Sequence, residues 1–354
     1  MQNGTIMKGS RKKGCFCYFL SSNGAHFPKG RCDKVKARLL TTMIMSTMFS
    51  GMAMNPLCMA SQKPGIQDSP NIILMRIDKA CQKQAVNARI DPVWQLIPAL
   101  NGVRLNQKDS MIGWNHKSLE LTPLAFDQIP PSIGTEKFSD SPIYRGNPEK
   151  RQIALMFNVA WGEEYLNSIL ATLKKYNVKA TFFIDGKWAS THQSLVKTIL
   201  NSGMELGNHG YQHHLFSGLA KVQMAADISK TNAILHSAAG VIPTLFAPPA
   251  GDFNLLTVKV AASFGMKTIL WTVDTVDWKR PQPEVIAMRV LMKKSTGSLV
   301  LMHPTLPTSQ ALPSIITNLQ KEGYHLVTVS DLISPVRPVP KNIKEALASL
   351  RSPQ

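Results

Sequence analysis

From residue 151 onward, the sequence alternates short runs rich in β-branched and aromatic residues with stretches of helical periodicity. Helical stretches at 163–176 and 222–237 lie between such runs, and Gly203 and Gly240 are typical helix-ending residues. Repeated strand–helix units predict an α/β fold with a parallel sheet buried on both faces, either a closed barrel or a doubly wound sheet. The predicted strands are 153–159, 179–184, 204–208, 244–247, 267–273, 298–302 and 325–329.

Polar side chains occur where these predicted strands end. In βα barrels and in open α/β sheets alike, chemistry gathers at the carboxyl ends of the strands. We therefore expect these side chains to meet at one mouth of the sheet. In chain order they are Asn158, His209, His213, Asp252, Asp274, Asp277 and His303.

His209 and His213 are four residues apart, a spacing that places two imidazoles on one face of a helix and that zinc sites use. Helices also carry such pairs by chance, so the spacing alone leaves a purely structural role open. Their position after a predicted strand favours metal ligands.

The first sixty residues have the pattern of a delivery segment. Lys34, Lys36 and Arg38 precede an uncharged apolar run of 16 residues that begins at Leu39 and ends at Met54. This run is short for a bilayer span and suits the core of a secretory signal. We expect a signal peptide and a secreted protein; the alternative is an uncleaved signal anchor that tethers the protein to the membrane or cell wall.

Charge and cysteine content restrict the partners of the remaining chain. The net charge is +18, and residues 61–354 hold 31 basic and 21 acidic residues. This balance suits cell-wall polymers or lipid head groups, whereas the absence of a compact basic stripe with aromatic residues argues against nucleic acid. Cys81 is the one cysteine after residue 60, which excludes an internal disulfide or a thiolate zinc site there.

Composition divides the chain after the leader, residues 1–60, into four segments. Residues 61–121 carry Trp94 and Leu96 for one apolar face and predict a small αβ accessory module. Residues 122–150 contain five prolines, the composition of an extended linker. We expect the main domain over 151–335 and a C-terminal tail over 336–354.

Five motifs in chain order resemble those of the polysaccharide deacetylases, the NodB-type carbohydrate esterases. They are FNVAWG at 157–162, HGYQH at 209–213, APPAG at 247–251, DTVDW at 274–278 and LMHP at 301–304. The first and last motifs are similar to those of the YlxY-type sporulation deacetylases, a subgroup of that family. The resemblance implies a distorted (β/α)7 barrel, preceded here by the accessory module.

The resemblance also implies metal-dependent removal of acetyl groups from an N-acetylated glycan such as peptidoglycan. On this basis His209 and His213 hold a divalent metal, usually zinc, which polarises the acetamide carbonyl and activates a water molecule. His303 protonates the leaving amine, and Asp277 tunes His303. The residues expected to contact the substrate are Trp161, Tyr211, Pro249, Phe253, Asp274 and Trp278.

Three residues depart from the family's pattern. Asn158 occupies the place of the catalytic base, although an amide has no proton affinity near neutral pH. Val159 occupies the place of the third metal ligand, and catalytic zinc normally has three protein ligands. Ala247 replaces the arginine that pairs with the base. These changes agree with one another, because a buried arginine without an anionic partner would be an unpaired charge.

Two functions therefore remain open. In the first, the chain is a hydrolase of carbon–nitrogen bonds in which Glu163, Glu164 or Asp252 supplies the missing ligand, and the lost base lowers the rate by about 10²- to 10⁴-fold. In the second, the same barrel binds the glycan without cleaving it. The retained His303 and Asp277 favour the hydrolase.

Overall fold

The computed structural model describes residues 69–114 and 117–349. The chain divides into two units, Met1–Ser61 and Gln62–Gln354, and all described residues belong to the second. The expected leader, including the apolar run from Leu39, lies outside the described residues. Among the helices of the described ranges, none is long and apolar enough to cross a membrane.

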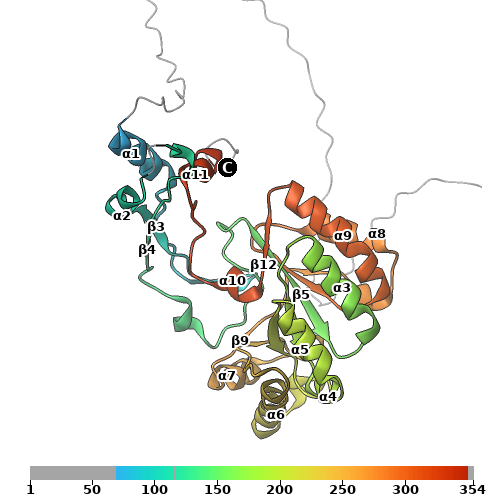
Figure 1. The fold of residues 1–354 in the computed structure, drawn as a ribbon. Helices are drawn as coiled ribbons and strands as arrows, with labels where there is room; N and C mark the ends of the chain where they lie inside the picture. Colours follow the sequence, from blue (N-terminus) through green and yellow to red (C-terminus); the bar gives the residue numbers. More distant parts are fainter. Residues whose placement is uncertain (1–68, 115–116, 350–354) are drawn as a thin grey trace, which may run out of the picture. The chain divides into compact units, whose positions relative to one another are not determined.

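A curled parallel sheet organises the described chain (Figure 1). Its middle strand, β5 (Gln152–Val159), pairs with β6 (Thr181–Ile184) on one side and β11 (Leu299–Met302) on the other. The sheet continues from β6 through β7 (Glu205–Asn208) and β8 (Leu245–Phe246) to β9 (Lys267–Thr268), and from β11 to β10 (Val273–Asp274). β12 (His325–Val327) pairs with the first part of β5. This architecture confirms the predicted α/β fold of a distorted βα barrel.

Helices cover the outer face of the sheet. Figure 1 shows α3 (Glu163–Lys175), α8 (Pro283–Lys293) and α9 (Leu306–Lys321) together on one side. Proline opens α8, and the Thr305 hydroxyl caps α9 by accepting a hydrogen bond from the Thr308 N–H, so local sequence sets both starts. The remaining helices of the barrel are α4 (Gly186–Thr191), α5 (Gln193–Asn201), α6 (Lys221–Ala239), α7 (Leu255–Ser263) and α10 (Val329–Ile333).

Both faces of β5 are covered, and all eight of its residues are buried. Side chains at odd positions, from Ile153 to Val159, pack in the apolar cluster beneath the helices. Side chains at even positions, Ala154 and Met156, pack in the cluster inside the curl. Because strand residues alternate between faces, Asn158 shares the inner face with Met156.

The sequence predicts one strand over 267–273, but the structure divides this segment in two. β9 pairs with β8, and β10 pairs with β11 on the far side of the sheet. Between them, Ile269 forms a bridge with Ile143, and the Leu270 N–H donates to the Ile143 carbonyl oxygen. The segment before β5 therefore pairs with the backbone between β9 and β10, in the place where a neighbouring strand of the sheet would pair. No strand pairing joins β9 to β10 within the described residues.

A small module precedes the barrel. It contains α1 (Pro70–Cys81), β1 (Arg89–Asp91), β2 (Gln95–Ile97), β3 (Gly102–Leu105), α2 (Gln107–Ile112) and β4 (Phe126–Ile129). β4 lies in the proline-rich segment expected to be an extended linker and pairs with β3. The module also includes α11 (Ile343–Ser349), because Ile343 and Ala346 are buried with Ile73 and Leu74 of α1. The expected C-terminal tail thus supplies part of this module's core.

Candidate active site

Register and side-chain alternation define the mouth of the sheet. Met302 of β11 pairs with Phe157 of β5, and Ile184 of β6 pairs with Asn208 of β7, so the strands end at nearby levels. Met156, Phe183 and Leu301 point to the inner face of the sheet. Because side chains alternate between faces, the residue two positions after each of them points to the same face at the end of its strand. The residues in this inner layer are His303, Asn158, Asp185, His209 and Ala247, in the order β11, β5, β6, β7 and β8.

His303 and Asp277 form a buried pair at the β11 side of the mouth. The Asp277 carboxylate is 0% exposed and lies 2.8 Å from His303 Nδ1. It also accepts hydrogen bonds from the His303 backbone N–H at 2.6 Å and from the Thr308 hydroxyl at 2.6 Å. Trp161 stacks on His303, with its ring 5.8 Å from the His303 ring and nearly parallel to it. The His303 imidazole is therefore fixed in both position and orientation.

The loop that carries Asp277 contains strained backbone. Val276 has a φ of 54°, a left-handed conformation that is costly for a β-branched residue. Its N–H donates to the Asp274 carboxylate at 2.8 Å, which holds the turn. The Asp274 carboxylate is therefore hydrogen-bonded to the backbone of the loop that carries Asp277. Trp278, the residue after Asp277, is 51% exposed.

His209 and His213 lie together, but on a turn rather than a helix. Gly210, Gln212 and His213 have positive φ values of 72°, 63° and 54°, so this stretch is not helical and the two rings do not share a helix face. The two imidazole rings still lie 5.3 Å apart, edge to face. The residues with left-handed backbone close the turn and place the His213 ring beside the His209 ring. The four-residue spacing in the sequence does not specify this geometry.

Burial keeps His209 uncharged. Its side chain is 1% exposed, and Nδ1 donates to the Ala247 carbonyl oxygen at 2.7 Å, which leaves Nε2 as an acceptor. Desolvation, followed by repulsion from His213, lowers the pKa of His209 to about 3. The pKa of His213 is also lowered, mainly by desolvation, and the nearby Asp185 carboxylate opposes that shift. Both rings have the neutral form that a metal ligand requires.

Two buried carboxylates hold the histidine turn in place. Asp185 accepts hydrogen bonds from the Trp188 N–H at 3.0 Å and from the His213 N–H at 2.9 Å. Asp227 accepts from the Tyr211 N–H at 2.5 Å, and its other oxygen lies 2.9 Å from His214 Nδ1. Burial raises the pKa of Asp227, against the effect of the His214 contact.

The described residues do not supply the three ligands of a catalytic zinc. No group of three or more His, Cys, Asp or Glu side chains within 69–114 and 117–349 has the geometry of a metal site. Val159 is fully buried in the helix-facing cluster. Of the carboxylates expected to replace it, Glu163 accepts from the Trp188 indole N–H at 3.3 Å, and Asp252 accepts from the N–H and hydroxyl of Ser217. The donor set therefore stops at two imidazoles.

A cavity of about 560 Å³ opens beside the mouth on its β5–β6 side. Trp161, expected to contact substrate, lines it and is 38% exposed. Among the other expected contacts, Pro249 is buried, Phe253 is partly buried, and the Tyr211 ring is covered by the Lys230 ammonium at 3.7 Å. The complete lining is Ala160, Trp161, Asp185, Lys187, Trp188, Thr191, Gln212 and His213.

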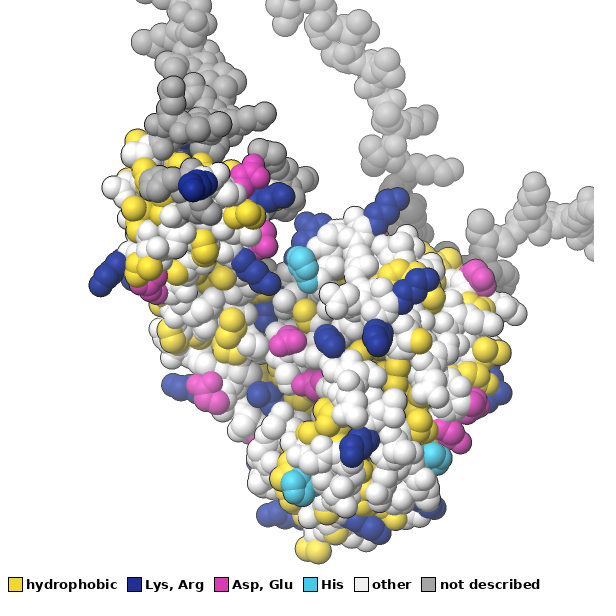
Figure 2. Space-filling model, viewed as in Figure 1, with side chains coloured by type: hydrophobic (Ala, Val, Ile, Leu, Met, Phe, Trp, Pro, Cys, Tyr) yellow, Lys and Arg dark blue, Asp and Glu magenta, His cyan; other side chains and the backbone are white. Residues whose placement is uncertain are grey.

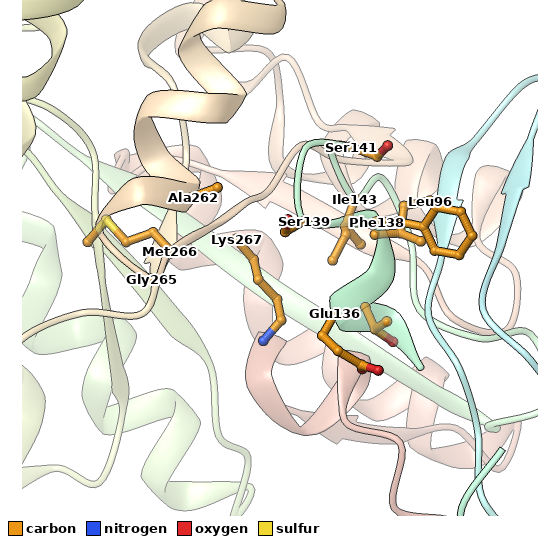
Figure 3. Close-up of a pocket in the computed structure, with 11 residues that line it drawn as sticks. Leu96, Glu136, Phe138, Ser139, Ser141, Ile143, Ala262, Gly265, Met266 and Lys267 are labelled. Carbon is orange, nitrogen blue, oxygen red and sulfur yellow. The ribbon is translucent and has the colours of Figure 1, made fainter. Parts of the chain in front are cut away.

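A second cavity, of about 170 Å³, shares no lining residue with the mouth. Figure 3 shows Ala262 and Met266 on one wall and Leu96 and Phe138 on the other. It is mainly apolar and contains none of the residues expected from sequence to bind substrate. On the face in Figure 2, lysine and arginine side chains are scattered rather than gathered into a stripe.

Four residues at the site escaped the sequence analysis, namely Asp185, Trp188, Asp227 and Thr308. Asp185 directly follows the predicted strand 179–184 and thus carried the same signal as the other strand-end residues. Thr308 and Asp227 lie within helices, and only the tertiary structure brings them to Asp277 and to the histidine turn.

A curled parallel sheet with an imidazole pair and an Asp–His pair at one mouth defines a NodB-type βα barrel. Comparison with known proteins agrees: the family model described as polysaccharide deacetylase matches residues 145–269. The chain is 42% identical over 252 residues to the uncharacterized protein YlxY of Bacillus subtilis, covering 71% of this chain and 79% of that protein. The chain belongs to the polysaccharide deacetylase family.

Two further comparisons concern activity. The crystal structure of BA3943, a CE4 family pseudoenzyme from Bacillus anthracis, superposes with a TM-score of 0.70 at 39% identity, covering 77% of this chain and 97% of that chain. The peptidoglycan-N-acetylglucosamine deacetylase PgdA of Listeria monocytogenes is 34% identical over 183 residues, covering 51% of this chain and 39% of PgdA. Relatives thus include both a peptidoglycan deacetylase and a pseudoenzyme.

Proposed function

We propose that this chain binds an N-acetylated cell-wall glycan at the mouth of its barrel without hydrolysing it. Asn158 carries the proposal. It occupies the inner-face position at the end of β5 where the family resemblance places the general base, and its amide cannot take a proton from water. The two-imidazole donor set supports the same conclusion, because catalytic zinc normally has three protein ligands.

Features of the mouth and the relatives support a glycan as the partner. Exposed indoles at Trp161 and Trp278 offer flat apolar faces of the kind that stack on sugar rings. PgdA is named for its action on peptidoglycan N-acetylglucosamine. Export by the leader, to the cell wall or with a membrane tether, belongs to the same proposal.

Metal-dependent de-N-acetylation is the second candidate, and the His303–Asp277 pair favours it. The carboxylate holds His303 with Nδ1 protonated, so that Nε2 can carry and donate a proton. On this alternative His209 and His213 would hold the metal, which would polarise the acetyl carbonyl. A third ligand would then have to come from a rearranged side chain or from water.

Two measurements on the purified protein separate these functions. Co-sedimentation with peptidoglycan measures binding, and acetate release from acetylated chitooligosaccharides with added Zn²⁺ or Co²⁺ measures hydrolysis. We expect binding without acetate release. Metal-dependent acetate release that disappears in His303→Ala would instead establish the hydrolase, and failure to sediment with peptidoglycan would exclude the glycan binder.

A further inference from the structure

The cavity beside the mouth has two indole walls and a buried carboxylate. Trp161 and Trp188 line it from the segments that follow β5 and β6. Asp185 also lines it, although the residue is only 3% exposed. Its volume of about 560 Å³ lies within the range of small-ligand pockets.

Imidazole rings hold both indoles in fixed orientations. The His303 ring stacks on Trp161 at 5.8 Å, and the His192 ring stacks on Trp188 at 4.7 Å with 12° between planes. Trp188 also lies between two carboxylates, because its backbone N–H donates to Asp185 and its indole N–H donates to Glu163. A rigid aromatic ring flanked by anions is suited to attract a cation.

Two buried side chains on this side of the mouth have unused hydrogen-bond acceptors. Asn158 Oδ1 is buried and has no hydrogen-bond partner. Asp185 lies on the neighbouring strand and the same inner face, and its carboxylate offers about four acceptor sites. Backbone N–H groups use two of them. The arrangement favours a ligand that brings several N–H donors.

The carboxylate and the ammonium that line the cavity belong to Asp185 and Lys187. Glu163 lies outside the lining, where it accepts a hydrogen bond from the Trp188 indole N–H. Lys187 is exposed, so water screens its charge, whereas Asp185 is buried.

We propose that this cavity binds a hexosamine unit whose amine is free and protonated, in preference to its N-acetylated form. The inference rests on the proposed glycan binding and names the unit that is recognised. An ammonium group brings three N–H donors and a positive charge, whereas an acetamido group brings one N–H and no charge. A hydrolase that removes acetyl groups from the same polymer must supply this ligand.

Calorimetric titration of the purified protein with two probes tests the inference. The probes are the tetramer of glucosamine and the tetramer of N-acetylglucosamine, compared with EDTA present at about pH 6, where aliphatic amines are protonated. We expect the glucosamine tetramer to bind about tenfold more tightly. Added salt should weaken that preference because the recognition is electrostatic.

Variants assign the preference to the cavity. Asp185→Asn should bring the two affinities close together, and asparagine still caps α4 as aspartate does. Glu163→Gln keeps an acceptor for the indole and should reduce the preference by a smaller factor. Glu284→Gln is the matched control, since Glu284 is also exposed in the first turn of a helix but lies on α8, and it should leave both affinities unchanged.

The outcomes distinguish this inference from the proposed function. If the N-acetylated tetramer binds at least as tightly as the free amine, the amine preference is wrong while glycan binding stands. If neither tetramer nor peptidoglycan binds, the proposed function is wrong as well. A preference that requires added Zn²⁺ would assign recognition to a metal and would also overturn the inference.

Discussion

The fully buried carboxylate of Asp277 holds His303 at two points, the ring Nδ1 at 2.8 Å and the backbone N–H at 2.6 Å. Because a carboxylate only accepts, Nδ1 carries the proton and Nε2 is free. A third hydrogen bond from Thr308 completes the surroundings of Asp277. This arrangement is well defined whether the mouth cleaves glycan or only binds it.

Asp277→Ala should lower the free energy of unfolding by about 3–5 kcal/mol, because it removes one partner of a buried pair and leaves three donors unpaired. Urea denaturation followed by tryptophan fluorescence measures this loss. Asp274→Ala is the control: Asp274 is partly exposed and holds one backbone N–H, so we expect a loss of about 1 kcal/mol. Equal losses in the two variants would contradict the role of Asp277.

Gly162 permits a close approach between two loops at the mouth. Its φ is 86°, and a Cβ atom there would collide with the carbonyl oxygen of Pro304, the residue after His303. Gly162→Ala should therefore lower stability by about 2–4 kcal/mol and displace His303.

Gly240→Ala provides the matched control for that substitution. Gly240 also has a positive φ, 71°, but nothing lies within 4 Å of the added Cβ. We expect this variant to lose only about 1 kcal/mol, the cost of the backbone conformation. Thermal unfolding of both variants measures the difference, and similar melting temperatures would show that the contact with Pro304 is unimportant.

The buried His209 predicts a specific pH dependence of stability. Its pKa is about 3 in the folded protein and about 6.5 when unfolded, so the unfolded chain binds one more proton between these values. Stability from this residue is fully present above about pH 6.5 and falls by about 1.4 kcal/mol per pH unit as the pH drops toward 3.

Urea denaturation between about pH 5 and about pH 7 isolates that effect. In His209→Gln, the slope of the unfolding free energy against pH should correspond to the uptake of one proton fewer on unfolding than in the unmodified protein. His236→Gln changes an exposed histidine on α6 and should keep the original slope. An unchanged slope in His209→Gln would mean that His209 titrates alike in both states.

Arg337 joins the C-terminal segment to the module before the barrel. Its guanidinium donates to the carbonyl oxygens of Asn101 and Gln84 and pairs with Glu149 at 3.0 Å. Arg337→Ala should cost about 2–4 kcal/mol and raise hydrogen exchange in β3. Lys344→Ala, at an exposed position of α11, should leave exchange unchanged, and equal exchange in both variants would exclude this role of Arg337.

The alternation of apolar strand segments with helical segments predicted an α/β fold with a buried parallel sheet, and the choice of a βα barrel came from the resemblance to the polysaccharide deacetylases. The predicted strand 153–159 is β5 less its first residue, because a strand covered on both faces must be apolar throughout. The segment 267–273 was mispredicted because Ile143, more than a hundred residues away, pairs with Ile269. A competing partner so distant in the chain leaves no local signal.

The site was predictable only in part, for a related reason. Side chains after strand ends gave His209 and His303, and the geometry brings them to one inner layer. The turn at Gln212 depends on a left-handed φ and on hydrogen bonds that the Tyr211 and His213 backbone N–H groups donate to the carboxylates of Asp227 and Asp185. Spacing along the chain does not record such contacts.

The packing of α11 against α1 fixes an order of assembly. The small core around Ile73 and Leu74 lacks two of its buried members until Ile343 and Ala346 have been synthesised. All strands of the barrel precede residue 328. During translation, therefore, α1 emerges from the ribosome before the whole barrel but is among the last of the described helices to reach its final partner.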